Sequence, residues 1–493
     1  MSETYRFALV VAWTSAVALV AVLSNRITAR FKVPAPLLML VFAAVVVQVV
    51  PGLPVPVEGT VERVVTIALV LILFDGGMHI GWDRFRPAAG SIAIVGLAGT
   101  FLTAAGGAVV LHAVFGLPWY LAVLVATAVS PTDPAVVFSV LGQREIAGRS
   151  GTILEGESGA NDPVGIALMS GLLVAGTLSW AAFGYVGIEF ALQMVVGAAV
   201  GIAGGRALLW FMRRVTLPSE GLYPLRTLAC ALMLYGITTL AHGSGFLAVF
   251  VAGIVIGHRR APYQREIERF HSALAGLAEI VAFVVLGLTI DLAVLARIDV
   301  WIPGLTLGIL LACVIRPLFV RLCLIPARLQ RNERNFILFA GLKGAVPILL
   351  GELLRAAHVP DAERLYGIVV VVVIFSVLVQ GSLVPTVARR LRLPMRTVEP
   401  EPWAFGVRLR DEPEGAHQVL VEANSAVDGK TVHETANLAG DIWISIVVRD
   451  SQLVPVRAET QLIAGDQIVI LSDTDLSAAI ADLFTGPVEH DRR

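Results

Sequence analysis

The sequence predicts an all-α polytopic membrane protein with about thirteen transmembrane helices and a small α+β domain at its C-terminal end. The chain has 493 residues, of which 56% are hydrophobic and only 15% charged, whereas a soluble domain carries about 25% charge. Its mean hydropathy is +0.79. Long apolar segments recur, and the composition changes after Met395, where charged residues and prolines become frequent. A net charge of −1 without a long basic run gives no indication of nucleic-acid binding.

Thirteen apolar segments are long enough to cross a hydrocarbon layer of about 30 Å, at about 1.5 Å per helical residue. They are residues 7–23, 34–50, 61–80, 89–115, 117–141, 153–178, 183–211, 222–241, 243–258, 270–290, 299–320, 335–354 and 366–388.

Lysine and arginine gather in every second loop, which predicts the orientation of the spans because positive loops stay in the cytoplasm. The opposite side carries only Arg6, Arg63, Arg297, Arg355 and Arg364. We therefore expect a multi-pass protein of the cell (inner) membrane, with its N-terminus outside and its C-terminus in the cytoplasm. The alternation of charge from loop to loop favours an odd number of spans.

The C-terminal part is predicted to be a separate cytoplasmic domain. The predicted boundaries are a transmembrane domain at 1–393, a linker at 394–416, the small domain at 417–486 and a tail at 487–493. The pattern of the small domain indicates strands near 418–423, 441–450 and 465–473, and short helices near 429–437 and 475–484.

Four spans carry an ionisable residue about eight or nine residues from the cytoplasmic end, near the middle of the membrane. These residues are Asp133, Asp162, Glu279 and Lys343. A charge at this depth costs several kcal/mol unless it is paired or hydrated, so such residues are functional candidates. The alternative is that polar side chains hold helices together, and this alternative is strongest for Glu279.

The sixth span begins with the most polar stretch of the hydrophobic region. Ser158, Asn161 and Asp162 share one helical face, and Glu157 lies beside it, one turn below Asn161. Burial disfavours the charged form of a carboxylate, so Asp162 can hold a proton or a cation but not both.

Two further residues are candidates for a vestibule or an ion pair. Asp75, near the inner end of span 3, would attract cations to a cytoplasmic vestibule or simply end the helix. Arg316 would pair with Glu279, or its long side chain would reach the membrane interface.

Helix-breaking residues surround two of the midplane groups. Pro131 and Pro134 flank Asp133, while Gly341, Gly344 and Pro347 surround Lys343. Broken helices in membranes are tolerated where they line a cavity. The two spans lie seven apart and run in opposite directions, which predicts crossed discontinuous helices in two inverted six-helix repeats, spans 1–6 and 8–13. Two unrelated proline kinks are the alternative.

Four motifs carry a resemblance to a known family: "TDPAV", "EGESGANDPVGIAL", "HGSGFLAVFVAGIVIG" and "GLKGAVPI". Together they resemble the monovalent cation–proton antiporter superfamily, in its branch of electroneutral sodium/proton and potassium/proton exchangers, over roughly residues 10–390. The stretch "LFDGGMHIGWDRFRP" is similar to the potassium/proton subgroup. Residues 417–486 resemble a TrkA-type C-terminal regulatory domain, which is often joined to transporters of that subgroup.

The resemblance implies a homodimer whose core domain moves against a dimerisation domain in the lipid bilayer. It implies a monovalent cation held by Asp133, Ser158, Asp162 and the main-chain carbonyl of Thr132. The remaining site residues would give the site its shape, and they are Glu157, Asn161, Pro134 and Lys343. Family members usually have arginine at position 343. The lysine keeps the charge that would balance Glu157 but lacks the planar fork of arginine.

The predicted function is therefore exchange of K⁺, or alternatively Na⁺, for H⁺, one for one and without net charge movement. We expect a secondary transporter rather than an enzyme, without a cofactor, and with a small regulator such as a nucleotide as the candidate ligand of the cytoplasmic domain. Three other functions are alternatives: a cation channel gated by the tail, a membrane-embedded enzyme built on "GESG", and a carrier of organic substrates.

Overall fold

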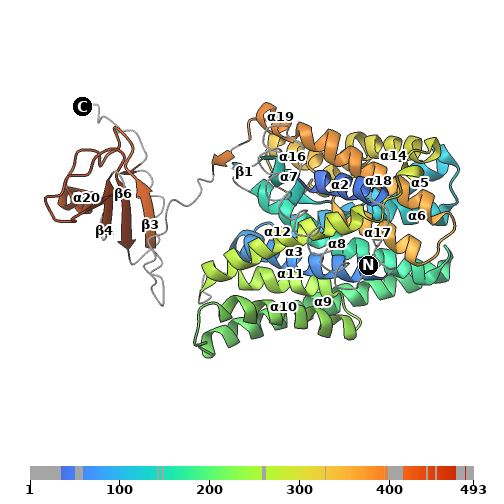
Figure 1. The fold of residues 1–493 in the computed structure, drawn as a ribbon, viewed down its shortest axis with the longest axis horizontal. Coiled ribbons are helices and arrows are strands. Elements are labelled where there is room, and N and C mark those ends of the chain that lie inside the picture. Colours follow the sequence, from blue (N-terminus) through green and yellow to red (C-terminus); the bar gives the residue numbers. More distant parts are fainter. Residues whose placement is uncertain are drawn as a thin grey trace. The chain divides into compact units, whose positions relative to one another are not determined.

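Helices fill the first of the two units, Met1–Pro402 and Trp403–Arg493, into which the computed structural model divides the chain (Figure 1). The structure describes residues 35–49, 59–141, 144–146, 149–257, 263–327, 329–393, 395–397, 415–439, 442–449, 452–472 and 483–484.

Helices occupy the positions of the second to the thirteenth predicted segments, while the first segment, 7–23, lies outside the described residues. The helices of the first half are α2 (Ala35–Val49), α3 (Thr60–Phe85), α4 (Ala89–Ile94), α5 (Thr100–Phe115), α6 (Trp119–Ala128), α7 (Pro134–Leu141), α8 (Arg149–Ala175) and α9 (Trp180–Arg214). Those of the second half are α10 (Leu222–Leu240), α11 (Gly245–Ile256), α12 (Gln264–Gly287), α13 (Leu292–Leu295), α14 (Ile298–Leu310), α15 (Arg316–Cys323), α16 (Arg331–Phe339), α17 (Ala345–Ala356), α18 (Ala362–Phe375) and α19 (Ser382–Arg390).

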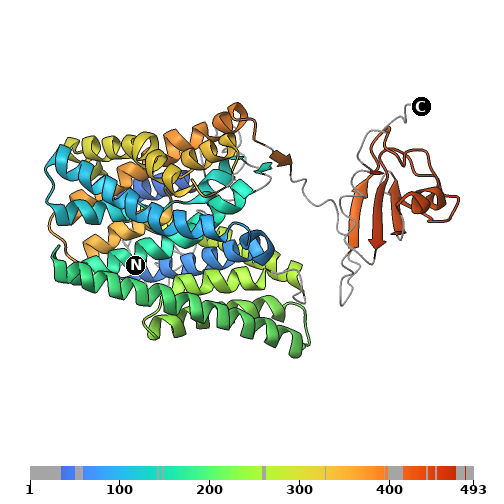
Figure 2. The same ribbon diagram turned by 180° about the vertical axis from the view of Figure 1, so that it is seen from behind.

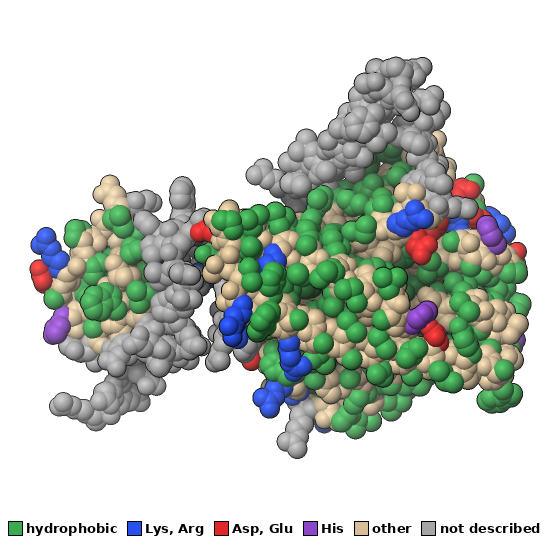
Figure 3. All heavy atoms as spheres, turned by 90° about the horizontal axis from the view of Figure 1, so that it is seen from below, with side chains coloured by type: hydrophobic (Ala, Val, Ile, Leu, Met, Phe, Trp, Pro, Cys, Tyr) green, Lys and Arg blue, Asp and Glu red, His purple; other side chains and the backbone are tan. Residues whose placement is uncertain are grey.

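This unit has the surface of a membrane protein. Within the described part of the chain, six continuous helical stretches are long and apolar enough to cross a bilayer. In Figure 3 hydrophobic side chains are spread over the helical unit, and charged side chains are few. Large apolar residues such as Trp180, Ile188 and Leu240 are exposed, which suits contact with lipid rather than with water. The chain is a multi-pass membrane protein.

The helices pack as two groups. In the first bundle α3 packs on α11 and α12, α2 lies on α12, and α9 and α10 cover α11. In the second bundle α18 packs on α14 and α17, and α5 lies against α6. Helix α8 contacts both bundles, through α3 and α9 on one side and α6 on the other. Figures 1 and 2 show α9, α10 and α11 on one side of the unit and α5, α14 and α18 on the other.

Two spans are broken where the proline and glycine pattern predicts it. The chain is not helical between α6 and α7, at residues 129–133, or between α16 and α17, at residues 340–344. Three other spans contain a π-helical turn that the sequence did not indicate: Val95–Gly99, Leu311–Ile315 and Ser376–Gly381. Such turns widen a helix locally and are frequent at functional sites.

A two-stranded sheet was not predicted. Strand β1 (Arg144–Ile146) pairs antiparallel with β2 (Met395–Thr397), so that Glu145 faces Arg396 in the register. The second strand lies within the predicted linker 394–416, which is therefore not entirely a linker.

The C-terminal unit is a four-stranded antiparallel sheet with strand order β3-β6-β4-β5 and one described helix, α20 (Val432–Ala439). Its strands are β3 (Gly415–Leu420), β4 (Ile442–Arg449), β5 (Gln452–Val454) and β6 (Gln467–Ser472). Val447, Ile468 and Ile470 form its core. Strand β3 begins two residues inside the predicted linker, and the predicted helix 475–484 falls almost wholly outside the described residues.

Candidate ion-binding site

The two helix breaks meet each other in the second bundle. The backbone N–H of Asp133, in the first break, donates to the carbonyl of Leu342 in the second, at 2.8 Å. The ammonium of Lys343 crosses back and donates to the carbonyls of Ser130 at 2.9 Å and Pro131 at 3.1 Å. The carbonyls of Ser130 and Pro131, which lie outside the helices, thus accept from the ammonium of Lys343. Backbone polar groups inside a membrane need such partners.

Asp133 lies at the N-terminal ends of two helices. Its Oδ1 accepts the backbone N–H of Ala135, in the first turn of α7, at 2.9 Å. The N–H of Ala345, which begins α17, also interacts with this carboxylate. Helix N-termini favour negative charge. Gly344 is required at its position, because a Cβ there would overlap the Asp133 carboxylate.

Asp162 is buried in the middle of α8 and has the fewest partners of the site carboxylates. Its Oδ2 accepts the hydroxyl of Ser158, one turn earlier, at 3.3 Å. Pro163 follows it inside the helix and has no N–H to donate to the carbonyl of Gly159. Only 6% of Asp162 is exposed, so its carboxylate lies almost entirely out of contact with solvent.

Thr132 connects the first break to α8. The amide of Asn161 donates to the Thr132 hydroxyl at 2.8 Å, and the backbone N–H of Thr132 donates back to Asn161 Oδ1 at 3.3 Å. The same hydroxyl lies 3.5 Å from Glu157 Oε1. The predicted polar face of α8, through Asn161, therefore fixes the non-helical residues 129–133 next to Asp162.

Glu157 is paired with Arg316, and this corrects two expectations. Nη1 and Nη2 of Arg316 donate to the two oxygens of Glu157 at 2.7 and 3.0 Å. Arg316 therefore neither pairs with Glu279 nor extends to the membrane interface. The partner of Glu157 is Arg316 and not Lys343. Arg316 follows a π-helical turn, and Gly341 gives it room, because a Cβ at Gly341 would overlap the guanidinium.

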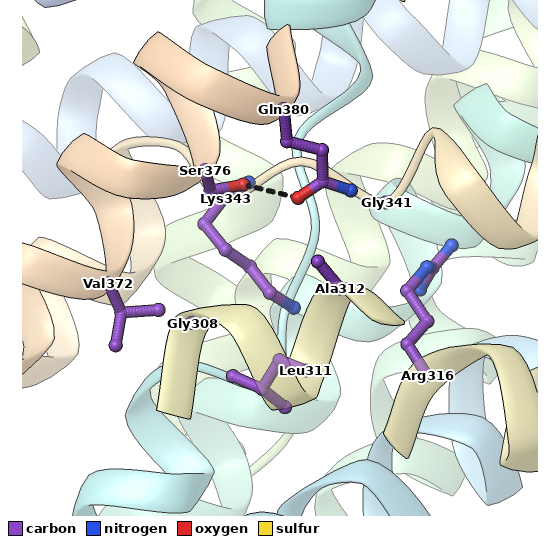
Figure 4. Close-up of a pocket in the computed structure, with 9 residues that line it drawn as sticks. All are labelled: Gly308, Leu311, Ala312, Arg316, Gly341, Lys343, Val372, Ser376 and Gln380. Carbon is purple, nitrogen blue, oxygen red and sulfur yellow. Dashed lines mark hydrogen bonds between the residues drawn. The ribbon is translucent and has the colours of Figure 1, made fainter. Parts of the chain in front are cut away.

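The side chains of Lys343 and Arg316 line one small cavity with Ser376 and Gln380, as Figure 4 shows. The planar fork that the resemblance implies for family members at position 343 is supplied in this chain by Arg316. The two cationic residues thus have different partners. Arg316 neutralises the Glu157 carboxylate, and Lys343 donates to the backbone carbonyls of the first break.

Ser376 and Gln380 also belong to the site, although neither was predicted from the sequence. The backbone N–H of Lys343 donates to the Ser376 hydroxyl at 3.0 Å, which in turn donates to Gln380 Oε1 at 3.2 Å. The Gln380 amide donates to the carbonyl of Phe339, at the end of α16. The signal was a polar pair four residues apart in an otherwise apolar span.

Two other candidates, Asp75 and Glu279, lie on the first bundle. Asp75 accepts the hydroxyl of Ser272 at 3.1 Å and lies 3.4 Å from His79 Nδ1. In the described structure, Oε1 of Glu279 is buried without a hydrogen-bond partner.

The family model of the transmembrane sodium/hydrogen exchanger matches residues 8–390. The chain belongs to this family. A solved structure, the sodium proton antiporter MjNhaP1 from Methanocaldococcus jannaschii, superposes with a TM-score of 0.66 over 78% of this chain and 99% of that chain, at 20% identity. That likeness concerns the fold.

Curated relatives in this family are closer in sequence. The chain is 38% identical to the K(+)/H(+) antiporter NhaP of Alkalimonas amylolytica over 334 residues, which are 66% of this chain and 57% of that protein. It is 31% identical to the K(+)/H(+) antiporter NhaP2 of Shewanella oneidensis over 478 residues, 96% of this chain and 82% of that protein.

Proposed function

We propose that the protein is a secondary active antiporter that exchanges a monovalent cation for a proton at Asp133 and Asp162. Membership of the sodium/hydrogen exchanger family and the names of the NhaP and NhaP2 relatives support cation/proton antiport. The observation that carries the proposal is the set of charges at the crossed breaks.

Those charges leave one net negative charge. Three carboxylates, Asp133, Asp162 and Glu157, face two cationic side chains, Arg316 and Lys343. Arg316 neutralises Glu157 directly, and Lys343 offsets the charge of one of the two aspartates. One proton or one monovalent cation then completes the neutralisation. Because the same site takes either, each replaces the other, and one-for-one exchange moves no net charge.

The ligands proposed for the cation are oxygen atoms, which suit hard cations such as Na⁺ and K⁺. They are the carboxylates of Asp133 and Asp162, the Ser158 hydroxyl and the main-chain carbonyl of Thr132. Glu157, Asn161, Pro134 and Lys343 would hold these groups in place. We favour K⁺ because NhaP and NhaP2 are K(+)/H(+) antiporters. Na⁺ is the second candidate, since a Na(+)/H(+) antiporter, NhaH of Halobacillus aidingensis, is 26% identical over 351 residues.

Alternating access would follow from movement between the two bundles. The crossed breaks lie in the second bundle, and Asp162 lies on α8, which contacts both. We propose a homodimer with thirteen spans in the cell membrane, the N-terminus outside, and the C-terminal unit in the cytoplasm. The arginines in alternate loops support this orientation.

Flux measurements test the function. Purified protein in liposomes, carrying an internal pH indicator, would receive K⁺, Na⁺ or choline outside. We expect proton movement with K⁺, a smaller response with Na⁺, none with choline, and no effect of a clamped membrane voltage. Cation flux that is driven by voltage without proton movement would instead indicate a channel.

Asp162→Asn should reduce exchange at least about a hundredfold, since a unit charge about 4 Å from a cation is worth about 4 kcal/mol at intermediate permittivity. The neutral amide keeps the shape and removes a buried charge, so the elution volume of the purified protein should not change. Exchange at the wild-type rate in this variant would disprove the proposed site.

We further propose that the C-terminal unit, as a TrkA-type domain, regulates transport by binding a small ligand such as a nucleotide. A ligand shifts the transporter only through different affinities for its two states. A chain that ends at Pro402 keeps strand β2 and should still exchange cations, with an altered pH profile. An unchanged profile and no response of the full chain to nucleotides would leave the unit with a structural role only.

A further inference from the structure

Glu279 is the midplane carboxylate that the charge balance of the site leaves out. It lies on α12, in the first bundle, whereas the crossed breaks belong to the second. Its Oε1 is buried and has no hydrogen-bond partner in the described structure, and the charge that acts on it is that of Asp133. A carboxylate that only held helices together would have a donor within reach, so its position requires another reason.

The helix face below Glu279 leads towards the end of α12 that the arginines mark as cytoplasmic. Ser272, Ala275, Gly276 and Glu279 have the spacing of a single face. At its lower end the Ser272 hydroxyl donates to Asp75 at 3.1 Å. Between the two polar ends stand only alanine and glycine, and a Cβ added to Gly276 would meet no atom within 4 Å. The face therefore has a carboxylate near each end and open space at Gly276, while Ala275 beside it is buried.

The opposite end of α12 is closed against the second bundle. The hydroxyls of Thr289, just after α12, and Tyr366, on α18, are 2.7 Å apart. Arg355, on α17, donates to Glu352 at 2.9 Å and lies 3.5 Å from the Thr289 carbonyl. The two bundles are thus joined at the outer end of α12, while the inner half of the same helix has open space beside it.

We propose that Glu279 is a relay carboxylate: it receives monovalent cations from the cytoplasmic opening marked by Asp75 and Ser272 and passes them to Asp133 and Asp162. This rests on the proposed antiport function and adds an entry route on one side of the membrane. The path from Ser272 to Glu279 is two turns of α12, about 10 Å. A cation on this path has the carboxylate of Asp75 at one end and that of Glu279 at the other. The unpartnered oxygen of Glu279 is free to bind it.

The test is the sidedness of cation affinity in Glu279→Gln. Exchange would be measured with the cation gradient on the cytoplasmic side, in everted membrane vesicles, and on the outer side, in right-side-out vesicles. We expect the apparent KM for K⁺ to rise about tenfold from the cytoplasmic side, as for the loss of one nearby charge, and to stay unchanged from outside. Glu268→Gln is the matched control, because Glu268 lies on the same helix and accepts from Gln264.

The outcomes separate the two proposals. If the wild-type protein exchanges cations and Glu279→Gln has unchanged KM values on both sides, the relay is wrong. Equal increases on both sides would indicate general damage and also overturn it. Absence of exchange in the wild type would instead overturn the proposed function.

A second measurement does not depend on transport. Glu279→Cys, in a chain whose cysteines at 230, 313 and 323 are replaced by serine, should react with a membrane-impermeant thiol reagent from the cytoplasmic side. Added K⁺ should slow the reaction if the space beside Gly276 leads to the site. Lack of reaction from that side would show that the route does not exist.

Discussion

Two arginine–carboxylate pairs, one in each unit, have nearly the same bond lengths but differ in the exposure of the arginine. In the helical unit Arg316 holds Glu157 at 2.7 and 3.0 Å, and the two side chains are only 4% and 3% exposed. In the C-terminal unit Arg449 holds Asp466 with two bonds of 2.8 Å, and its side chain is 32% exposed while the aspartate is fully buried.

The comparison shows that the same fork serves two purposes. Asp466 also accepts the backbone N–H of Ile463, and Arg449 donates to the carbonyl of Gln461, so this pair closes the turn before β6. Glu157 lies beside Thr132 and the ion-binding carboxylates instead. A buried pair is costly to form and costlier to break from one side. We therefore expect the membrane pair to matter for both stability and transport, and the other for stability alone.

The largest effect is expected for Arg316→Ala. It leaves Glu157 buried without its partner, which should cost about 3–5 kcal/mol of folding free energy. Exchange should be lost as well, because the extra negative charge disturbs the balance at Asp162. Thermal unfolding in detergent and proton flux in liposomes would measure the two effects. Arg206→Ala is the control, since that arginine is exposed on α9.

The pair itself is tested by adding Glu157→Gln to Arg316→Ala. Removing both charges should restore much of the lost stability without restoring full transport. Losses that simply add in the double variant would contradict a direct pair.

A smaller effect is expected for Arg449→Ala, about 2–3 kcal/mol, because the buried Asp466 that remains still accepts the backbone N–H of Ile463. Hydrogen exchange of β4 and β6 in the full chain should increase, while cation exchange by the protein stays at the wild-type rate. Arg457→Ala, at an exposed position, should change neither. Loss of transport in Arg449→Ala would contradict a role of the Arg449–Asp466 pair in stability alone.

The smallest effect concerns the start of α20, where Thr431 and Glu434 bond each other's backbone N–H groups as a capping box. The Thr431 hydroxyl also donates to the Glu434 carboxylate, at 2.8 Å. The bonds from the Thr431 N–H and hydroxyl lower the pKa of Glu434 below its usual value. The stabilisation is present above the unfolded-state pKa and is lost as the pH falls through the lowered folded-state pKa. Hydrogen exchange in the first turn of α20 should therefore rise under acid, and Glu434→Gln should remove this pH dependence.

Much of the fold follows from local properties of the sequence. Apolar length places the spans, and the prolines and glycines around Asp133 and Lys343 mark both breaks. The π-helical turns and the pairing of β1 with β2 did not follow, because they depend on packing between residues far apart in the chain. Their local sequences, such as "LACVI" before Arg316, are ordinary for a membrane helix.

The site was predictable as a set of residues but not as a set of pairs. Helical spacing brings Ser158, Asn161 and Asp162 to one face, and depth in the membrane adds Asp133 and Lys343. Whether Glu157 meets position 316 or position 343 depends on the rotation of α15 and on the space at Gly341. Sequence spacing carries no information on either.

The small sheet of β1 and β2 has a mechanical consequence. Strand β1 lies between α7, which follows Asp133, and α8, which carries Asp162, while β2 immediately precedes residues 398–414. The three residue pairs between β1 and β2 tie residues 395–397 to residues 144–146, and we call this tie the strap. A pull on the polypeptide at residue 398 is borne first by this strap, and through it by the loop that joins the two helices of the site.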